Sequence, residues 1–112
     1  MDPQHAKQLL TQERARIEAG LAALDREEPL EGDENVEPGD EGSEDMYLDE
    51  LEAADRERLK RELEALQRAE ERLAAGTYGL SVQSGEPIPD GRLEALPLAE
   101  RTVEEEERYR RS

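Results

Sequence analysis

The 112-residue sequence contains no cysteine, no tryptophan and no phenylalanine, and it has a single histidine. Without cysteine, the chain can form no disulfide, no thiolate metal site and no thiol nucleophile. No apolar run is long enough for a signal peptide or a membrane helix, so we expect a cytoplasmic protein. The histidine, His5, has no serine or cysteine constellation around it, and we therefore expect no enzyme activity.

Hydrophobic residues make up 34% of the chain and charged residues 41%. This composition favours long solvated helices with a narrow apolar seam over a broad globular core. The net charge of −16 argues against direct DNA binding, which requires a basic face. Between residues 25 and 52 there are fourteen acids and one base, so most of the acidity belongs to one segment.

The first segment has the features of a helix from about residue 3 to residue 28. Asp2 is suited to cap it, and Pro3 to occupy its first position. Gly20 is its weak point, at a cost of roughly 1 kcal/mol relative to alanine. The apolar residues recur at seven, four and three positions and predict one stripe: Leu10, Ile17, Leu21 and Leu24.

Residues 29–45 lose this periodicity and contain two prolines, three glycines and eight acids. We expect a mobile acidic loop there. A second helix should start near residues 43–45 and end at residue 75, before Gly76. Its predicted stripe is Leu48, Leu51, Leu59, Leu63, Leu66 and Leu73. Residues 1–75 are thus predicted to form a long antiparallel coiled-coil hairpin with the loop as its tip, in a mainly all-α protein.

Residues 76–112 are predicted to form a small knuckle with a short hairpin, followed by a C-terminal helix. A turn is expected at residues 84–87 and a helical turn from Asp90. Thr102 and Glu105 fit a capping box that would start the last helix. The core candidates of the knuckle are Tyr78, Leu80, Val82, Ile88, Leu93, Leu96 and Leu98.

Four polar residues in this region have the spacing of a four-cysteine zinc finger. Ser81 and Ser84 form one pair, Thr102 and Glu105 form the other, and seventeen residues separate the two pairs. This is the Cys-x2-Cys-x15–20-Cys-x2-Cys spacing with every cysteine replaced.

Around this frame the chain resembles the DksA/TraR family of bacterial transcription regulators. The resemblance covers about a third of the chain residue by residue, and the preceding hairpin matches the family architecture. The matching residues are Gly76-Thr77-Tyr78-Gly79, Gly85-Glu86-Pro87-Ile88-Pro89, Arg92-Leu93-Glu94-Ala95-Leu96-Pro97 and Ala99.

The resemblance implies a monomer that binds RNA polymerase, with its hairpin in the secondary channel and acidic tip residues near the catalytic magnesium. The Asp-x-x-Asp-x-Ala tip motif of well-studied relatives is absent, so the tip candidates rest on charge: Asp33, Glu34, Asp40 and Glu41. The basic end of the last helix is a possible docking site on the polymerase rim, or simply a cationic helix terminus. It comprises Arg108, Arg110 and Arg111.

The resemblance maps the zinc ligands of the family onto Ser81, Ser84, Thr102 and Glu105. Neutral hydroxyls are poor zinc ligands, so we expect no zinc and a knuckle joined by hydrogen bonds instead. The cofactor ppGpp, which acts with some relatives, has no assignable site here. Its candidate residues are equally eligible: Arg56, Arg58, Lys60 and Arg61.

Two other interpretations remain open. The chain could be a coiled-coil interaction module that pairs with itself or with another helical protein. It could also be a degenerate relative that folds but has lost its contact with polymerase.

Overall fold

The computed structural model describes residues 1–26 and 42–111, and these residues form four helices. The helices are α1 (Pro3–Arg26), α2 (Gly42–Ala75), α3 (Asp90–Ala95) and α4 (Val103–Arg111). The described residues contain no named strand, so the prediction of a mainly all-α protein is confirmed. The tip candidates between residues 33 and 41 lie outside the described residues.

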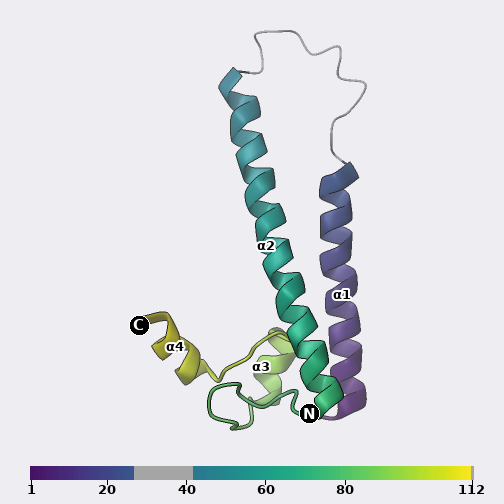
Figure 1. Cartoon of the computed structure of the whole chain (residues 1–112), viewed down its shortest axis with the longest axis vertical. Coiled ribbons are helices and arrows are strands. Elements are labelled where there is room, and N and C mark those ends of the chain that lie inside the picture. Colours follow the sequence, from purple (N-terminus) through teal and green to yellow (C-terminus); the bar gives the residue numbers. More distant parts are fainter. Residues whose placement is uncertain (27–41, 112) are drawn as a thin grey trace.

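Helices α1 and α2 lie side by side and form the predicted antiparallel hairpin (Figure 1). Its buried core comes from one stripe on each helix: Leu10 and Ile17 on α1, and Leu59, Leu66 and Ala69 on α2. Partly buried leucines at residues 21, 24, 63 and 73 pack against this core. The periodic leucines therefore pair the two helices, as the spacing predicts.

The start of α1 and the end of α2 agree with the sequence, whereas α2 begins at Gly42, inside the predicted loop of residues 29–45 and one residue before the predicted helix start. The Asp2 carboxylate accepts the His5 amide at 3.1 Å, which satisfies one free donor at the start of α1. Helix α2 ends at residue 75 as predicted, because Gly76 adopts a left-handed conformation with φ of 81°. The Thr77 amide then bonds to the Arg72 carbonyl at 2.8 Å and closes the last turn. The predicted end of α1 at residue 28 falls outside the described residues.

Two leucines of the predicted α2 stripe do not belong to the core. Leu48 and Leu51 are 53% and 46% exposed. Helix α2 has 34 residues and α1 has 24, and the N-terminal part of α2 extends beyond the end of α1 (Figure 1). The prediction for these two residues was wrong because the described part of α1 does not reach them.

The knuckle begins after Gly76 with a short antiparallel bridge between Leu80 and Pro87. Ile88 and Leu93 are buried, whereas Leu80, Val82 and Leu96 are exposed, so these three were wrongly predicted to be core. Successive side chains of an extended segment point to opposite sides. Residues 80 and 82 therefore face outward while Ser81, which lies between them, points inward and is 5% exposed.

Candidate functional site

The four positions of the cysteine-less frame come together in the folded knuckle. The Ser81 hydroxyl donates a 2.6 Å hydrogen bond to Glu105 Oε1, which joins the short hairpin to α4. The same Ser81 oxygen accepts the amides of Gln83 at 3.0 Å and Ser84 at 3.2 Å. Ser81 and Glu105 are both 5% exposed, so this cluster is the polar centre of the knuckle.

The second pair of the frame forms the capping box that the sequence predicts. The Glu105 amide donates to Thr102 Oγ1 at 3.2 Å, and the Thr102 amide donates to Glu105 Oε1 at 3.0 Å. Glu105 therefore caps α4 and receives the Ser81 hydroxyl with the same oxygen. Hydrogen bonds from Ser81, from Ser84 and from the Thr102 amide lower the pKa of Glu105 to about 2.

The donor set of this cluster does not match a structural zinc site. Such sites are built from thiolates and imidazoles, whereas three of the four side chains here are neutral hydroxyls. The one carboxylate already has its Oε1 committed to two donors. Among the residues that the structure describes, no group of three or more His, Cys, Asp or Glu side chains could hold a metal ion.

Apolar packing joins the knuckle to the base of the hairpin. Tyr78 and Leu98 are half-buried and pack against the hairpin core. The Tyr78 hydroxyl donates to the Pro97 carbonyl at 2.8 Å. Burial raises the pKa of Tyr78, which further favours the protonated phenol that donates this hydrogen bond.

Polar contacts attach α3 to the start of the chain. The amino group of Met1 lies 3.5 Å from Asp90, and the His5 imidazole bonds to Glu94. These pairs bring both ends of α3 against the first residues of the chain. They also give His5 a structural partner within the described part of the chain.

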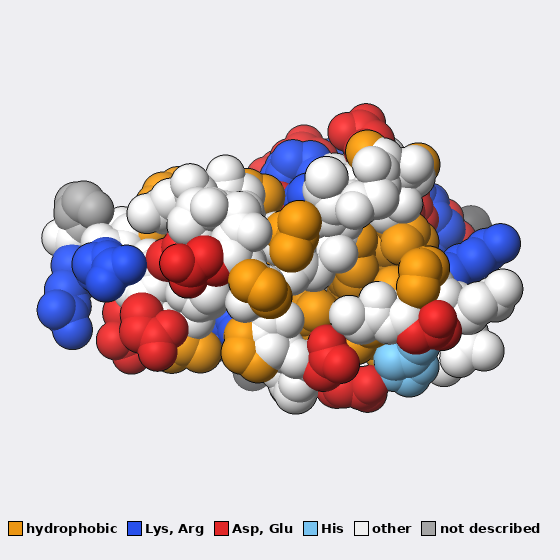
Figure 2. Space-filling view, turned by 90° about the horizontal axis from the view of Figure 1, so that it is seen from below, with side chains coloured by type: hydrophobic (Ala, Val, Ile, Leu, Met, Phe, Trp, Pro, Cys, Tyr) orange, Lys and Arg blue, Asp and Glu red, His pale blue; other side chains and the backbone are white. Residues whose placement is uncertain are grey.

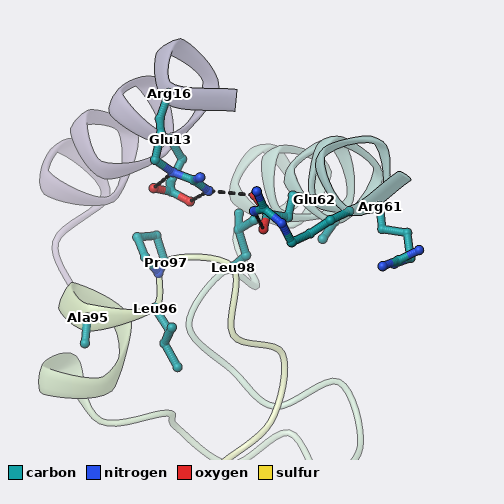
Figure 3. A pocket seen from close by; sticks show the side chains of 10 residues that line it. Glu13, Arg16, Arg61, Glu62, Ala95, Leu96, Pro97 and Leu98 are labelled. Atoms are coloured by element: carbon teal, nitrogen blue, oxygen red, sulfur yellow. Dashed lines mark hydrogen bonds and ion pairs between the residues drawn. The ribbon is translucent and has the colours of Figure 1, made fainter. Parts of the chain in front are cut away.

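A cleft of about 520 Å³ opens between the hairpin and the segment that follows α3 (Figure 3). Arg16 on α1 bonds to Glu62 on α2 at 2.9 Å across its upper wall. Pro97 and Leu98 close the lower wall. Arg58 and Arg61, two of the ppGpp candidates, also line this cleft.

The basic end predicted for the last helix is present and exposed. The arginines of the last turn of α4 are Arg108, Arg110 and Arg111. Seen from below, blue side chains gather at the end of the molecule where α4 ends, beyond a band of acidic side chains (Figure 2). Arg101 lies 3.9 Å from the Tyr109 ring centroid and braces the same helix. Helix α4 thus presents cations away from the hairpin.

Sequence reasoning missed Glu100, which contacts α2 and the short hairpin. Its partners lie 28 and 32 residues earlier in the chain. No local spacing rule reaches that distance, so an isolated sequence carries no signal for this contact.

None of the described helices is long and apolar enough to cross a membrane.

The fold and the frame together define a helical hairpin that carries a zinc-finger-like knuckle without cysteines. The chain is similar to the solved structure of transcription factor DksA2 from Pseudomonas aeruginosa, with a TM-score of 0.67 and 30% sequence identity. That similarity covers 97% of this chain and 80% of DksA2. The chain belongs to the DksA/TraR family.

Two curated proteins agree with this assignment. A 61-residue segment is 39% identical to the RNA polymerase-binding transcription factor DksA of two strains of Caulobacter vibrioides. The segment is 54% of this chain and 43% of each relative, so the match spans less than half the length of these relatives. No protein-family model matches the sequence.

Proposed function

We propose that this chain is a transcription regulator that binds bacterial RNA polymerase. The observation that carries the proposal is the likeness to DksA2 along nearly the whole chain, at 30% identity. It is supported by the segment shared with relatives that are named as RNA polymerase-binding factors. The proposed activity is binding in the cytoplasm, as a monomer, without catalysis and without direct contact to a DNA sequence.

The finer mechanism rests on the family resemblance and on charge. We propose that the hairpin enters the secondary channel of the polymerase and modulates initiation. The acids Asp33, Glu34, Asp40 and Glu41 would act at the tip, where carboxylate oxygens suit the coordination sphere of a magnesium ion. Helix α2, at about 1.5 Å per residue over its 34 residues, is long enough to hold the tip about 50 Å from the knuckle.

We further propose that the knuckle docks on the polymerase without zinc. The Ser81–Glu105 cluster takes the place of the metal, as its buried hydrogen bonds join the same two segments that the frame would otherwise bridge. The exposed arginines of α4 are suited to an acidic surface: Arg108, Arg110 and Arg111.

The decisive experiment is a pull-down with bacterial core RNA polymerase, together with competition by a known secondary-channel factor. We expect saturable binding that the competitor displaces. Absence of binding would refute the proposed function. Binding that the competitor does not displace would refute the secondary channel as the binding site.

A variant set separates the roles of the tip and the knuckle. Replacing the four tip acids with serine should abolish the effect on transcription and leave polymerase binding intact. The matched control removes four exposed acids elsewhere: Glu57, Glu64, Glu71 and Glu86. Replacing the three α4 arginines with glutamine should weaken binding more than replacing three exposed hairpin cations does: Lys7, Lys60 and Arg61. Equal effects in either comparison would contradict the assigned roles.

One observation favours the alternative of a self-pairing coiled coil. Leu48 and Leu51 lie three residues apart on α2 and are both exposed, so they could meet the same face of a second copy. Sedimentation equilibrium over a wide concentration range distinguishes the two proposals. A dimer that dissociates when both leucines are replaced by glutamine, combined with no polymerase binding, would favour the alternative.

A further inference from the structure

Glu100 joins three parts of the molecule that are distant in the sequence. Its Oε2 atom accepts hydrogen bonds from Arg68 Nε at 2.9 Å and from Arg72 Nη1 at 3.1 Å, both on α2. Its backbone carbonyl accepts the Val82 amide at 2.9 Å. One residue thus connects the base of the hairpin, the short hairpin of the knuckle and the segment that leads into α4.

The ionic contact is largely shielded from water. The side chains of Glu100 and Arg72 are 18% and 15% exposed, whereas Arg68 is 54% exposed. The Nε atom of the Arg72 guanidinium is buried and has no hydrogen-bond partner in the described part of the structure. Glu100 supplies the carboxylate that pairs with this guanidinium, through Nη1. Removing one member of a shielded pair leaves an uncompensated charge, which is strongly unfavourable.

The other side of the knuckle is attached by different contacts. Asp90 and Glu94 of α3 contact the first residues of the chain, and Tyr78 packs against the hairpin core. Helices α1 and α2 are the described pair that packs lengthwise, and α4 stands apart from both (Figure 1). On the side of the knuckle that leads into α4, the charged contact with α2 therefore depends on Glu100.

We propose that Glu100 is a positioning residue that fixes the orientation of the knuckle, and with it α4, relative to the hairpin. The importance of this orientation rests on the proposed function. If the tip and the basic end of α4 contact polymerase together, a fixed geometry between them reduces the ordering cost of binding.

The orientation can be measured on the free protein, because the chain has no cysteine that would compete for labels. Spin labels at Lys60→Cys on α2 and Glu107→Cys on α4 occupy exposed positions on the two sides of the junction. Pulsed electron paramagnetic resonance then gives the distribution of the distance between the two spin labels. The test variant is Glu100→Gln, which keeps the shape and removes the charge. The control is Glu86→Gln, which removes an exposed charge within the knuckle.

We expect the width of the distance distribution to at least double in Glu100→Gln and to stay unchanged in Glu86→Gln. A distribution in Glu100→Gln that matches the parent protein would overturn the proposal, even if the melting temperature falls. If Glu100→Gln loses the helical circular dichroism signal, Arg68→Gln takes its place because Arg68 is the more exposed partner. That variant should widen the distribution to a smaller extent, and an unchanged distribution would again contradict the proposal.

A second readout tests the pairing itself. Hydrogen exchange at the Val82 amide reports opening of the junction, and we expect a roughly tenfold faster rate in Glu100→Gln. Arg72→Gln should have a comparable effect, and the double variant should be little worse than either single variant, because both remove the same contact. Additive effects would mean that the two side chains act independently.

Polymerase binding separates this inference from the proposed function. If the parent protein binds, Glu100→Gln should bind more weakly than Glu86→Gln. If no variant binds polymerase, the proposed function fails while the distance and exchange measurements still decide the role of Glu100.

Discussion

Ser81 and Glu105, 24 residues apart in the sequence, share a buried 2.6 Å hydrogen bond at the centre of the knuckle. A zinc frame of this spacing holds its two segments through a metal shared by four ligands. Here one carboxylate oxygen takes the Ser81 hydroxyl and the Thr102 amide. A single acceptor oxygen therefore connects the short hairpin of the knuckle to the N-terminal cap of α4.

Replacing Ser81 with alanine should lower the melting temperature by about 5–15 °C, since it removes a charge-assisted hydrogen bond and leaves buried polar groups unpaired. The change deletes the donor to Glu105 and the acceptor of two backbone amides. Thermal unfolding followed by circular dichroism provides the measurement.

The matched control for Ser81→Ala is Thr77→Ala, in which an exposed hydroxyl outside the Glu105 cluster is removed. Its bond to the Arg72 carbonyl, at 3.4 Å, lies at the surface, so the loss should be clearly smaller. Equal losses in the two variants would show that burial of Ser81 does not contribute to stability.

The carboxylate of Glu105 makes the stability of the knuckle depend on pH. Its pKa falls from an ordinary value of 4.5 to about 2 on folding, so the folded state favours the ionised form. The corresponding stabilisation is fully present above pH 4.5 and is lost as the pH falls from about 4.5 toward 2. The difference in melting temperature between the parent protein and Glu105→Gln should therefore shrink over this range. A difference that stays constant would show that the charge is not involved.

Metal chelation tests the absence of zinc from the stabilising contacts. We expect a strong chelator to leave the melting temperature and the helical signal unchanged, and added zinc to have no effect. Metal analysis of the purified protein should find no stoichiometric zinc. Unfolding by the chelator, as occurs in true zinc fingers, would refute the proposal that hydrogen bonds replace the metal.

The hairpin was predictable because its information is local. Apolar residues spaced by three, four and seven positions define one face of a helix, and two such faces must cover each other. The caps were equally readable, since Asp2, Gly76 and the Thr102–Glu105 box each act within a few residues of their own position.

The knuckle was less predictable because its contacts are long-range and its core is small. Apolar character alone placed Leu80 and Val82 inside, yet Ser81 occupies the inward position between them because Glu105 requires its hydroxyl. The contact between Glu100 and α2 spans about thirty residues, beyond the reach of any periodicity. The tip acids remain a prediction from charge and resemblance.

The buried stripe of the hairpin should dominate its stability. Leu66 is fully buried, so Leu66→Ala should lower the free energy of unfolding by about 2–5 kcal/mol through lost burial and a residual cavity. Leu48→Ala is the control, because Leu48 is half-exposed at the other end of α2, and its cost should be about 0.5 kcal/mol or less. Urea unfolding measures both. A large cost for Leu48→Ala would indicate that the exposed leucine is covered in solution.

Gly20 leaves room for the Leu59 side chain of α2, which explains a residue that otherwise weakens α1. A Cβ atom at this position would lie 3.1 and 3.3 Å from the terminal methyl carbons of Leu59. Gly20→Ala should therefore cost about 1 kcal/mol net, because overpacking outweighs the gain in helix propensity.

The sign of the Gly20 effect should reverse once the obstacle is removed. In a Leu59→Ala background the methyl group of alanine has room, and Gly20→Ala should then stabilise the hairpin by about 1 kcal/mol, the propensity difference between glycine and alanine. Urea unfolding of the four proteins in this cycle provides the free energies. Stabilisation by Gly20→Ala in both backgrounds would mean that the Leu59 side chain moves aside freely, and that its packing against Gly20 has no energetic role.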